Sequence, residues 1–219
     1  AGNGVRTLNE LFPGRFTLGL GVSHAPVVQG MRGHVYEKPL PAMRMYLEAI
    51  YAGQHKLGKS TSLPIMLGAL GPLMLKLSGE LSQGALPYNV IPEHTAYARA
   101  KIGPERRLVV EQKVTLTSDP AEARRIARME LARYMTLPNY RNNWLRSGYS
   151  EDDVAGEGSD RFMDGMVAWG SEDDIRTRIQ AHLDAGADQV AIQPIIDHAL
   201  IDAGDFSGIA DALKALAPE

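Results

Sequence analysis

Short apolar runs alternate with amphipathic segments along the whole chain. The first run sets Phe16, Leu18 and Leu20 against Thr17 and Gly19, and this two-residue period is typical of a buried strand. Similar runs predict further strands later in the chain. We expect five neighbouring parallel strands in one sheet: Phe16–Gly21, Leu63–Leu67, Ala85–Tyr88, Leu108–Leu116 and Gln189–Gln193.

Helix signals occupy the segments between these strands. Pro72 stands where the first residue of a helix belongs, and Asp119-Pro120 joins an N-cap to a proline at the first helical position. Ser171-Glu-Asp-Asp174 resembles a capping box, and its helix should end at Gly186. This alternation predicts an α/β protein with parallel strands and helices outside them. A doubly wound sheet and an incomplete (β/α)8 barrel are both open at this point.

Two of the predicted strands run directly into glycine-containing turns. Gly21-Val-Ser-His24 follows the first strand and opens a long loop over residues 22–36, and Gly68-Ala-Leu-Gly71 follows the second. Glycine at a strand end lets a ligand approach the backbone, and the N–H groups at a helix start favour an anion. These turns predict a ligand-binding mouth with a phosphate at Gly68–Gly71. A flexible loop and a plain tight turn are the alternative interpretations.

Composition narrows the class of protein. The chain has 219 residues and a formal net charge of −3, without a basic stripe, so we predict a single domain over residues 1–219 and no nucleic-acid partner. The absence of cysteine excludes disulfides and thiolate chemistry and is compatible with a reducing cytoplasm. No apolar run approaches the roughly 18–20 residues of a membrane span, so we expect a cytoplasmic protein without a membrane partner.

Four motifs, in this order, resemble the luciferase-like monooxygenase superfamily, and most closely its branch that uses coenzyme F420, a deazaflavin. They are Gly14-Arg-Phe-Thr-Leu-Gly-Leu-Gly21, Gly68-Ala-Leu-Gly-Pro-Leu-Met-Leu-Lys-Leu-Ser78, Gly84-Ala-Leu-Pro-Tyr88, and Gly170-Ser-Glu-Asp-Asp174 with Ala185-Gly-Ala-Asp-Gln-Val190. The resemblance covers nearly the whole chain and implies a TIM-type barrel with an insertion. Our first strand would correspond to the fourth of that barrel, so the barrel would be incomplete and lack its first strands. The chain also lacks an initial methionine and opens like the end of a helix.

The resemblance further implies an oxidoreductase that transfers a hydride between coenzyme F420 and an unknown small organic substrate. FMN in place of coenzyme F420 is one alternative, and a non-catalytic incomplete barrel that binds a ligand or partner chain is another. The implied cofactor-binding residues fall into three groups: Gly68, Ala69, Leu70 and Gly71 for the phosphate and side chain, Gly19, Gly21, Val22 and Ser23 against the ring system, and Tyr88 near the tail. A barrel without its first strands would leave an edge and apolar faces open, so we expect a homo-oligomer or a second polypeptide.

Several single residues have competing interpretations. His24 is the candidate catalytic residue, as a proton donor or a hydrogen-bonding partner of the deazaflavin, although a loop histidine is more often structural or solvated. The other histidines lack metal-ligand spacing, so no metal is expected. Glu111, inside an otherwise apolar strand, points either into the barrel or outward between helices. We interpret Tyr140, Trp144 and Trp169 as residues of the core or of an interface.

Overall fold

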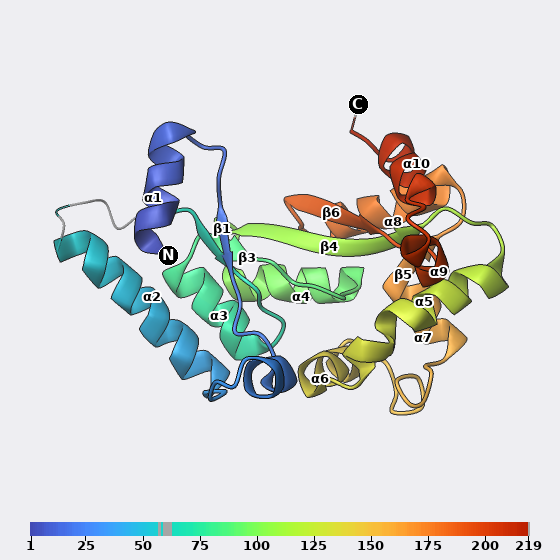
Figure 1. Cartoon of the computed structure of the whole chain (residues 1–219), viewed down its shortest axis with the longest axis horizontal. Coiled ribbons are helices and arrows are strands. Elements are labelled where there is room, and N and C mark those ends of the chain that lie inside the picture. Colours follow the sequence, from blue (N-terminus) through green and yellow to red (C-terminus); the bar gives the residue numbers. More distant parts are fainter. Residues whose placement is uncertain (57, 59–62, 219) are drawn as a thin grey trace. The chain divides into compact units, whose positions relative to one another are not determined.

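The structure is a computed structural model that describes residues 1–56, 58 and 63–218 (Figure 1). The chain divides into two compact units, one containing Ala1–Leu86 and Ala100–Leu108 and the other containing Pro87–Arg99 and the chain from Val109 onward. The single domain remains a prediction. No helix in the described part of the chain is both long and apolar enough to cross a membrane.

The first unit has parallel strands with helices between them. Its elements are α1 (Gly2–Leu11), β1 (Leu18–Leu20), the π-helix η1 (Pro26–Met31), α2 (Pro39–Lys56), β2 (Ile65–Leu67), α3 (Pro72–Leu81), β3 (Gly84–Ala85) and the first two residues of β4 (Arg107–Thr115). β1 pairs with β2, β2 with β3, and β3 with the start of β4, all in parallel. Figure 1 shows α2 and α3 side by side, and Met43 and Leu47 of α2 lie in a buried cluster with Ile65, Leu67 and Leu77.

The second unit is organised around the rest of β4. Its other elements are α4 (Pro92–Ile102, whose last residues belong to the first unit), α5 (Pro120–Met135), α6 (Pro138–Arg146), α7 (Asp160–Met166), β5 (Val167–Trp169), α8 (Glu172–Asp184), β6 (Gln189–Pro194), α9 (His198–Asp202) and α10 (Ser207–Ala215). β4 pairs in parallel with β5 through Lys113–Thr115 and with β6 through Val109–Val114. This strand therefore presents buried side chains on both of its faces.

The predicted helix starts are confirmed at three places. α3 begins at Pro72, and the Asp119 carboxylate accepts a hydrogen bond from the N–H of Ala121 at 2.9 Å at the start of α5. Ser171 and Asp174 form a complete capping box at the start of α8. The parallel pairing of the five predicted strands is also confirmed.

Some boundaries were predicted wrongly. β3 ends at Ala85, so Tyr88 lies beyond the strand, because Pro87 has no N–H with which to continue the pairing. β5 was missed because a three-residue strand directly after a helix leaves no alternation to recognise. η1 lies within residues 22–36, which were expected to be a loop.

Candidate functional site

The turn after β1 leaves part of its backbone open. An added Cβ at Gly19 would lie 3.1 Å from Leu86 Cδ1, whereas an added Cβ at Gly21 would meet nothing within 4 Å. Ser23 has a φ of 59°, which is uncommon for a residue with a side chain, and its carbonyl oxygen accepts a hydrogen bond from Tyr36 Oη at 3.2 Å. Strained backbone of this kind is found preferentially at functional sites.

The turn after β2 leads directly into α3. The N–H of Gly68 donates to the carbonyl oxygen of Leu20 at 2.7 Å, so this residue still belongs to the pairing with β1. Gly71 is the N-cap of α3, and no side chain caps this helix. Pro72 has no N–H, so the backbone N–H groups of Leu73 and Met74 are the ones without a partner inside the helix. The turn therefore presents two donors at the positive end of a helix dipole.

The backbone conformation at position 71 does not require a glycine. Its φ of −81° and ψ of 159° are extended backbone angles that any residue adopts, so a need for left-handed backbone does not explain glycine at this position.

His24 lies at the start of η1. Its carbonyl oxygen accepts hydrogen bonds from the N–H groups of Val27 and Val28, both at 3.0 Å, and its side chain is half-buried. Burial lowers the pKa of its imidazole from the usual value, so His24 is mainly neutral at pH 7. A neutral imidazole can donate or accept a hydrogen bond, but it is a weaker source of a proton than an imidazolium.

Tyr88 lies in the second unit, whereas the other predicted site residues lie in the first. Its hydroxyl oxygen is 2.7 Å from Lys113 Nζ, 2.8 Å from Gln193 Oε1 and 3.0 Å from Tyr134 Oη. The ammonium of Lys113 donates to Tyr88, and Tyr88 in turn donates to the amide oxygen of Gln193. The cofactor-tail role of Tyr88 remains a prediction.

Lys113 is the centre of a buried polar cluster that the sequence analysis missed. Its side chain is 1% exposed, and Nζ lies 3.1 Å from Glu111 Oε1 and 3.6 Å from Glu130 Oε1. The same ammonium sits over the rings of Tyr88 and Tyr134, 4.1 Å and 5.4 Å from their centroids. Glu111 thus faces a buried cation rather than solvent between helices.

Burial perturbs the ionisable groups of this cluster. It raises the pKa of Glu111, although Lys113 and the N–H of Asn89, 3.0 Å from the carboxylate, oppose this effect. Burial also raises the pKa of Tyr88, and it raises the pKa of Tyr134 to about 12. Both phenols are therefore protonated at neutral pH.

The other face of β4 carries a different network. His182 of α8 lies 2.8 Å from Thr95 Oγ1 through Nδ1 and 2.9 Å from Gln112 Oε1 through Nε2. Burial lowers the pKa of His182 to about 4, so the ring is neutral at pH 7. Gln112 Nε2 donates to the carbonyl oxygens of Lys113 and Met166, so its Oε1 is the acceptor for His182. Every polar atom in this chain of bonds has a partner, as expected of a structural network.

A simple signal would have found the cluster around Lys113. Glu111 and Lys113 are two residues apart on a strand, so they project from the same face, and Lys113 pairs in register with Gln193. Charged residues at alternate positions of a buried strand are rare unless they are paired. The period-two pattern of polar residues therefore indicated a buried site on one face of β4.

A cavity of about 560 Å³ in the first unit lies at the opposite ends of the strands. Its lining includes Arg6, Phe16, Pro64 and Arg107, which precede or begin the strands instead of following them. In TIM-type barrels residues at this end serve stability, whereas the chemistry sits where the strands end. We assign this cavity no part in the candidate site.

Comparison with known proteins identifies the family. The profile of the luciferase-like monooxygenases matches residues 2–189. The 5,10-methylenetetrahydromethanopterin reductase of Archaeoglobus fulgidus is 29% identical, over 85% of this chain and 69% of that protein.

Solved structures share the fold. One is an F420-dependent secondary alcohol dehydrogenase in complex with an F420-acetone adduct, with a TM-score of 0.64 and 13% identity over 99% of this chain and 74% of that one. Another is the oxygenating constituent of a type II Baeyer–Villiger monooxygenase from Pseudomonas putida in complex with FMN, with a TM-score of 0.63 and 17% identity over 100% and 73% of the two chains. The predicted α/β fold of incomplete TIM-barrel type is confirmed. Which barrel strands the described strands correspond to remains a prediction. The chain therefore belongs to the luciferase-like monooxygenase family of enzymes.

Proposed function

We propose that this protein is an oxidoreductase that transfers a hydride between coenzyme F420 and a small organic substrate. The observation that carries the proposal is the start of α3, where two backbone donors follow a strand and no side chain caps the helix. Such a helix start binds phosphate groups readily. A relative and a solved structure with the same fold both carry F420 in their names, and this cofactor would supply the phosphate.

The residues of the first unit fit a phosphate-bearing deazaflavin. The turn Gly68–Gly71 would receive the phosphate, because Gly71 has no side chain that could cap the N–H groups of Leu73 and Met74. Gly19, Gly21, Val22 and Ser23 would lie against the ring system, and the open space at Gly21 supports this assignment. His24, neutral at pH 7, would serve as a hydrogen-bonding partner of the ring. When bound, the deazaflavin supplies the hydride, and the protein orients it and excludes water.

FMN is the second candidate cofactor. It also carries a phosphate, so the turn at Gly68–Gly71 does not separate it from coenzyme F420, and a solved structure with the same fold holds FMN. A non-catalytic protein that binds a ligand or a partner chain is the alternative to both. Titration of the purified protein with coenzyme F420 and, separately, with FMN, followed by cofactor fluorescence, distinguishes the three. We expect saturable binding of coenzyme F420 that is tighter than that of FMN; binding of neither would refute the proposal.

Self-association is part of the proposal. Among the described strands of the first unit, β1 pairs with β2 alone, so its second edge is available for a further strand. Open strand edges favour association. A second copy of this chain or another polypeptide would cover that edge.

A further inference from the structure

A cavity of about 370 Å³ in the second unit has no part in the function proposed above. Its lining residues come from the start of α4, the end of α6 and the turn after it, α7 and α8, and all of them belong to this unit. Cavities of this size are typical of small-molecule sites, which combine apolar walls with a few polar groups aimed at the ligand. The polar groups of this cavity therefore indicate what it could bind.

Tyr149 brings a hydroxyl without a hydrogen-bond partner to the wall of this cavity. The residue is 8% exposed, and Tyr149 Oη bonds to no residue that the structure describes. Its ring is held edge-on against Phe162, with centroids 5.1 Å apart, and the guanidinium of Arg161 lies 4.9 Å from its centroid. Burial raises the pKa of Tyr149 to about 12, so the hydroxyl is protonated at neutral pH. A buried donor of this kind is costly unless a ligand or water accepts its hydrogen bond.

Arg178 of α8 brings a guanidinium to the same wall. Its Nη1 donates to the carbonyl oxygen of Gly165 at 2.5 Å, and its Nη2 donates to that of Asp164 at 3.2 Å. Its other N–H groups have no partner among the described residues, and the carboxylate of Asp164 pairs with Arg124 instead. An added Cβ at Gly165 would clash with Tyr149 Oη, so this glycine brings the hydroxyl and the guanidinium together.

The cavity also presents a charge of the opposite sign. Glu93 lies in the first turn of α4 with an exposed side chain, and within the described ranges no basic group pairs with it. The second arginine of the lining, Arg161, is already neutralised, because its Nη1 lies 2.5 Å from Oδ2 of Asp153. A hydrogen bond from the N–H of Ser150 helps to lower the pKa of Asp153 to about 2, so this carboxylate is ionised. The two positive and two negative charges sum to zero, and Glu93 and Arg178 are the two that remain unpaired.

We propose that this cavity binds an α-amino acid with an aliphatic side chain. The carboxylate of the ligand accepts hydrogen bonds from Tyr149 Oη and from the N–H groups of Arg178, whose planar fork suits a carboxylate. The ammonium of the ligand pairs with Glu93, and Ile91 and Pro92 supply apolar wall for its side chain. A ligand that carries both charges keeps the sum at zero, whereas an anion alone would face the like charge of Glu93.

The site is independent of the proposed function. It lies entirely in the second unit, and none of the residues assigned to the cofactor turn or to the ring system lines it. Its tests therefore use the full chain without coenzyme F420.

The first test uses three probes that differ only in charge. L-Leucine carries both charged groups, 4-methylpentanoate lacks the ammonium, and 3-methylbutylamine lacks the carboxylate. Isothermal titration calorimetry at pH 7 measures the Kd of each. We expect saturable binding of L-leucine and an affinity roughly 10-fold or more weaker for either analogue, because each analogue gives up a charge-assisted interaction.

Three substitutions in the cavity separate the two charges. Tyr149→Phe removes one hydroxyl and no hydrogen bond between described residues, so it should leave the Tm nearly unchanged but weaken L-leucine roughly 5- to 10-fold. Glu93→Gln should abolish the preference for L-leucine over 4-methylpentanoate. Arg178→Gln should reduce the preference for L-leucine over 3-methylbutylamine. A residue with a purely structural role would affect all three probes equally.

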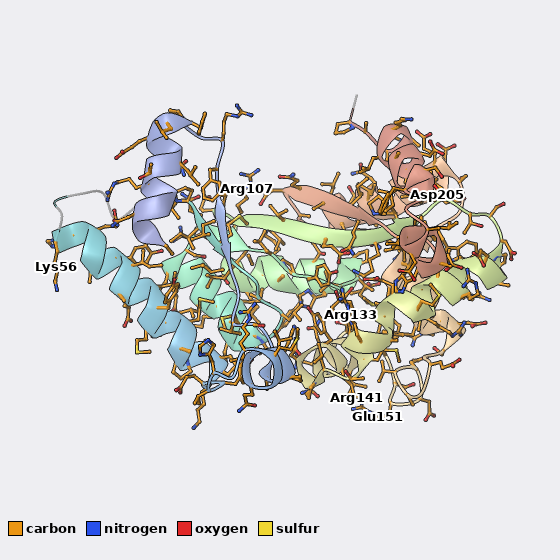
Figure 2. The ribbon with its side chains drawn as sticks, viewed as in Figure 1. Lys56, Arg107, Arg133, Arg141, Glu151 and Asp205 are labelled. Carbon is orange, nitrogen blue, oxygen red and sulfur yellow. The ribbon has the colours of Figure 1, made fainter. Side chains whose placement is uncertain are left out.

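Arg141 and Glu151 provide matched controls. Figure 2 labels this ion pair, which joins α6 to the segment after it and does not line the cavity. Arg141→Gln and Glu151→Gln remove the same charges from the same unit and should bind L-leucine as the wild type does. Thermal melts show that each variant is folded. If Arg178→Gln is unstable because the end of α7 loses its donor, Tyr149→Phe and Glu93→Gln still decide the question.

Three results would overturn the inference. They are the absence of saturable L-leucine binding, equal affinity of the wild type and Tyr149→Phe for L-leucine, and an undiminished preference for L-leucine over 4-methylpentanoate in Glu93→Gln. None of them bears on coenzyme F420, and failure of the protein to bind coenzyme F420 would refute the proposed function alone.

Discussion

Replacement of Gly71 by valine tests whether the turn before α3 holds a phosphate. Gly71 has extended backbone angles, which valine adopts without strain, so the substitution adds an isopropyl group beside the donors of Leu73 and Met74 and does not strain the local backbone. Valine is a poorer N-cap than glycine, and we expect a loss of about 0.5–1 kcal/mol of stability. For a chain of this length that corresponds to a fall in Tm of about 2–4 °C at most.

The effect on binding should be larger than the effect on stability. A hydrogen bond from a backbone N–H to a charged phosphate contributes about 1.5–3 kcal/mol, and the valine side chain should prevent at least one of the two such bonds. The expected loss of about 1–3 kcal/mol raises the Kd for coenzyme F420 roughly 5- to 150-fold. Fluorescence titration measures the Kd, and circular dichroism melts measure the Tm in the same samples.

Gly53→Val is the matched control. Gly53 lies in α2, and an added Cβ there would meet nothing within 4 Å, so the same change of side chain should leave the Kd unaltered. Equal affinity of the wild type and Gly71→Val for coenzyme F420 would show that this turn does not bind the phosphate. It would refute the reasoning from the N–H groups of Leu73 and Met74.

Three further predictions concern stability and assembly. Lys113→Met should lower the free energy of unfolding by about 3–5 kcal/mol in urea titrations, because Glu111 and Glu130 lose their buried cation; a loss below about 1 kcal/mol would contradict a buried charged pair. His182 has its pKa lowered from 6.5 to about 4, so its contribution to stability is fully present above pH 6.5 and is lost as the pH falls toward 4, by about 3 kcal/mol in total. His182→Gln should remove that part of the acid sensitivity, and an unchanged pH profile would argue against a buried neutral ring. Sedimentation at micromolar concentration should show a dimer or a larger species, whereas a stable monomer without a partner would rule out coverage of the free edge of β1.

The sequence was most informative where local chemistry decides the structure. Pro72, Pro120 and the Ser171–Asp174 box begin helices because proline and small polar residues satisfy or avoid the orphan N–H groups of a first turn without help from distant residues. The glycine turns were recognisable for the same reason. Their assignment to a cofactor nevertheless depends on the family resemblance and remains a prediction.

The same reasoning could reach only the part of the cluster around Lys113 that lies on β4. Its members come from the segment that follows β3, from β4, from α5 and from β6, so only the tertiary fold brings Tyr88, Glu130 and Gln193 to one ammonium. The charged pair Glu111 and Lys113 was visible in the sequence, two residues apart on one predicted strand, but the residues from other elements that complete the cluster were not. β5 was missed because its three residues carry no strand pattern of their own and form a strand by pairing with β4.

The two-sided character of β4 has a consequence for folding. Gln112 serves His182 on one face, and its neighbour Lys113 serves Glu111 and Tyr88 on the other. A slip of this strand by one residue would carry Lys113 and Glu111 to the face of the neutral His182 and bring Gln112 to the face of Glu130 and Tyr88, and both errors leave buried groups unsatisfied. The polar residues of β4 therefore favour the correct register of this strand during folding, because a misaligned strand would leave buried polar groups without partners. The apolar residues of the strand alone would not prevent that misalignment.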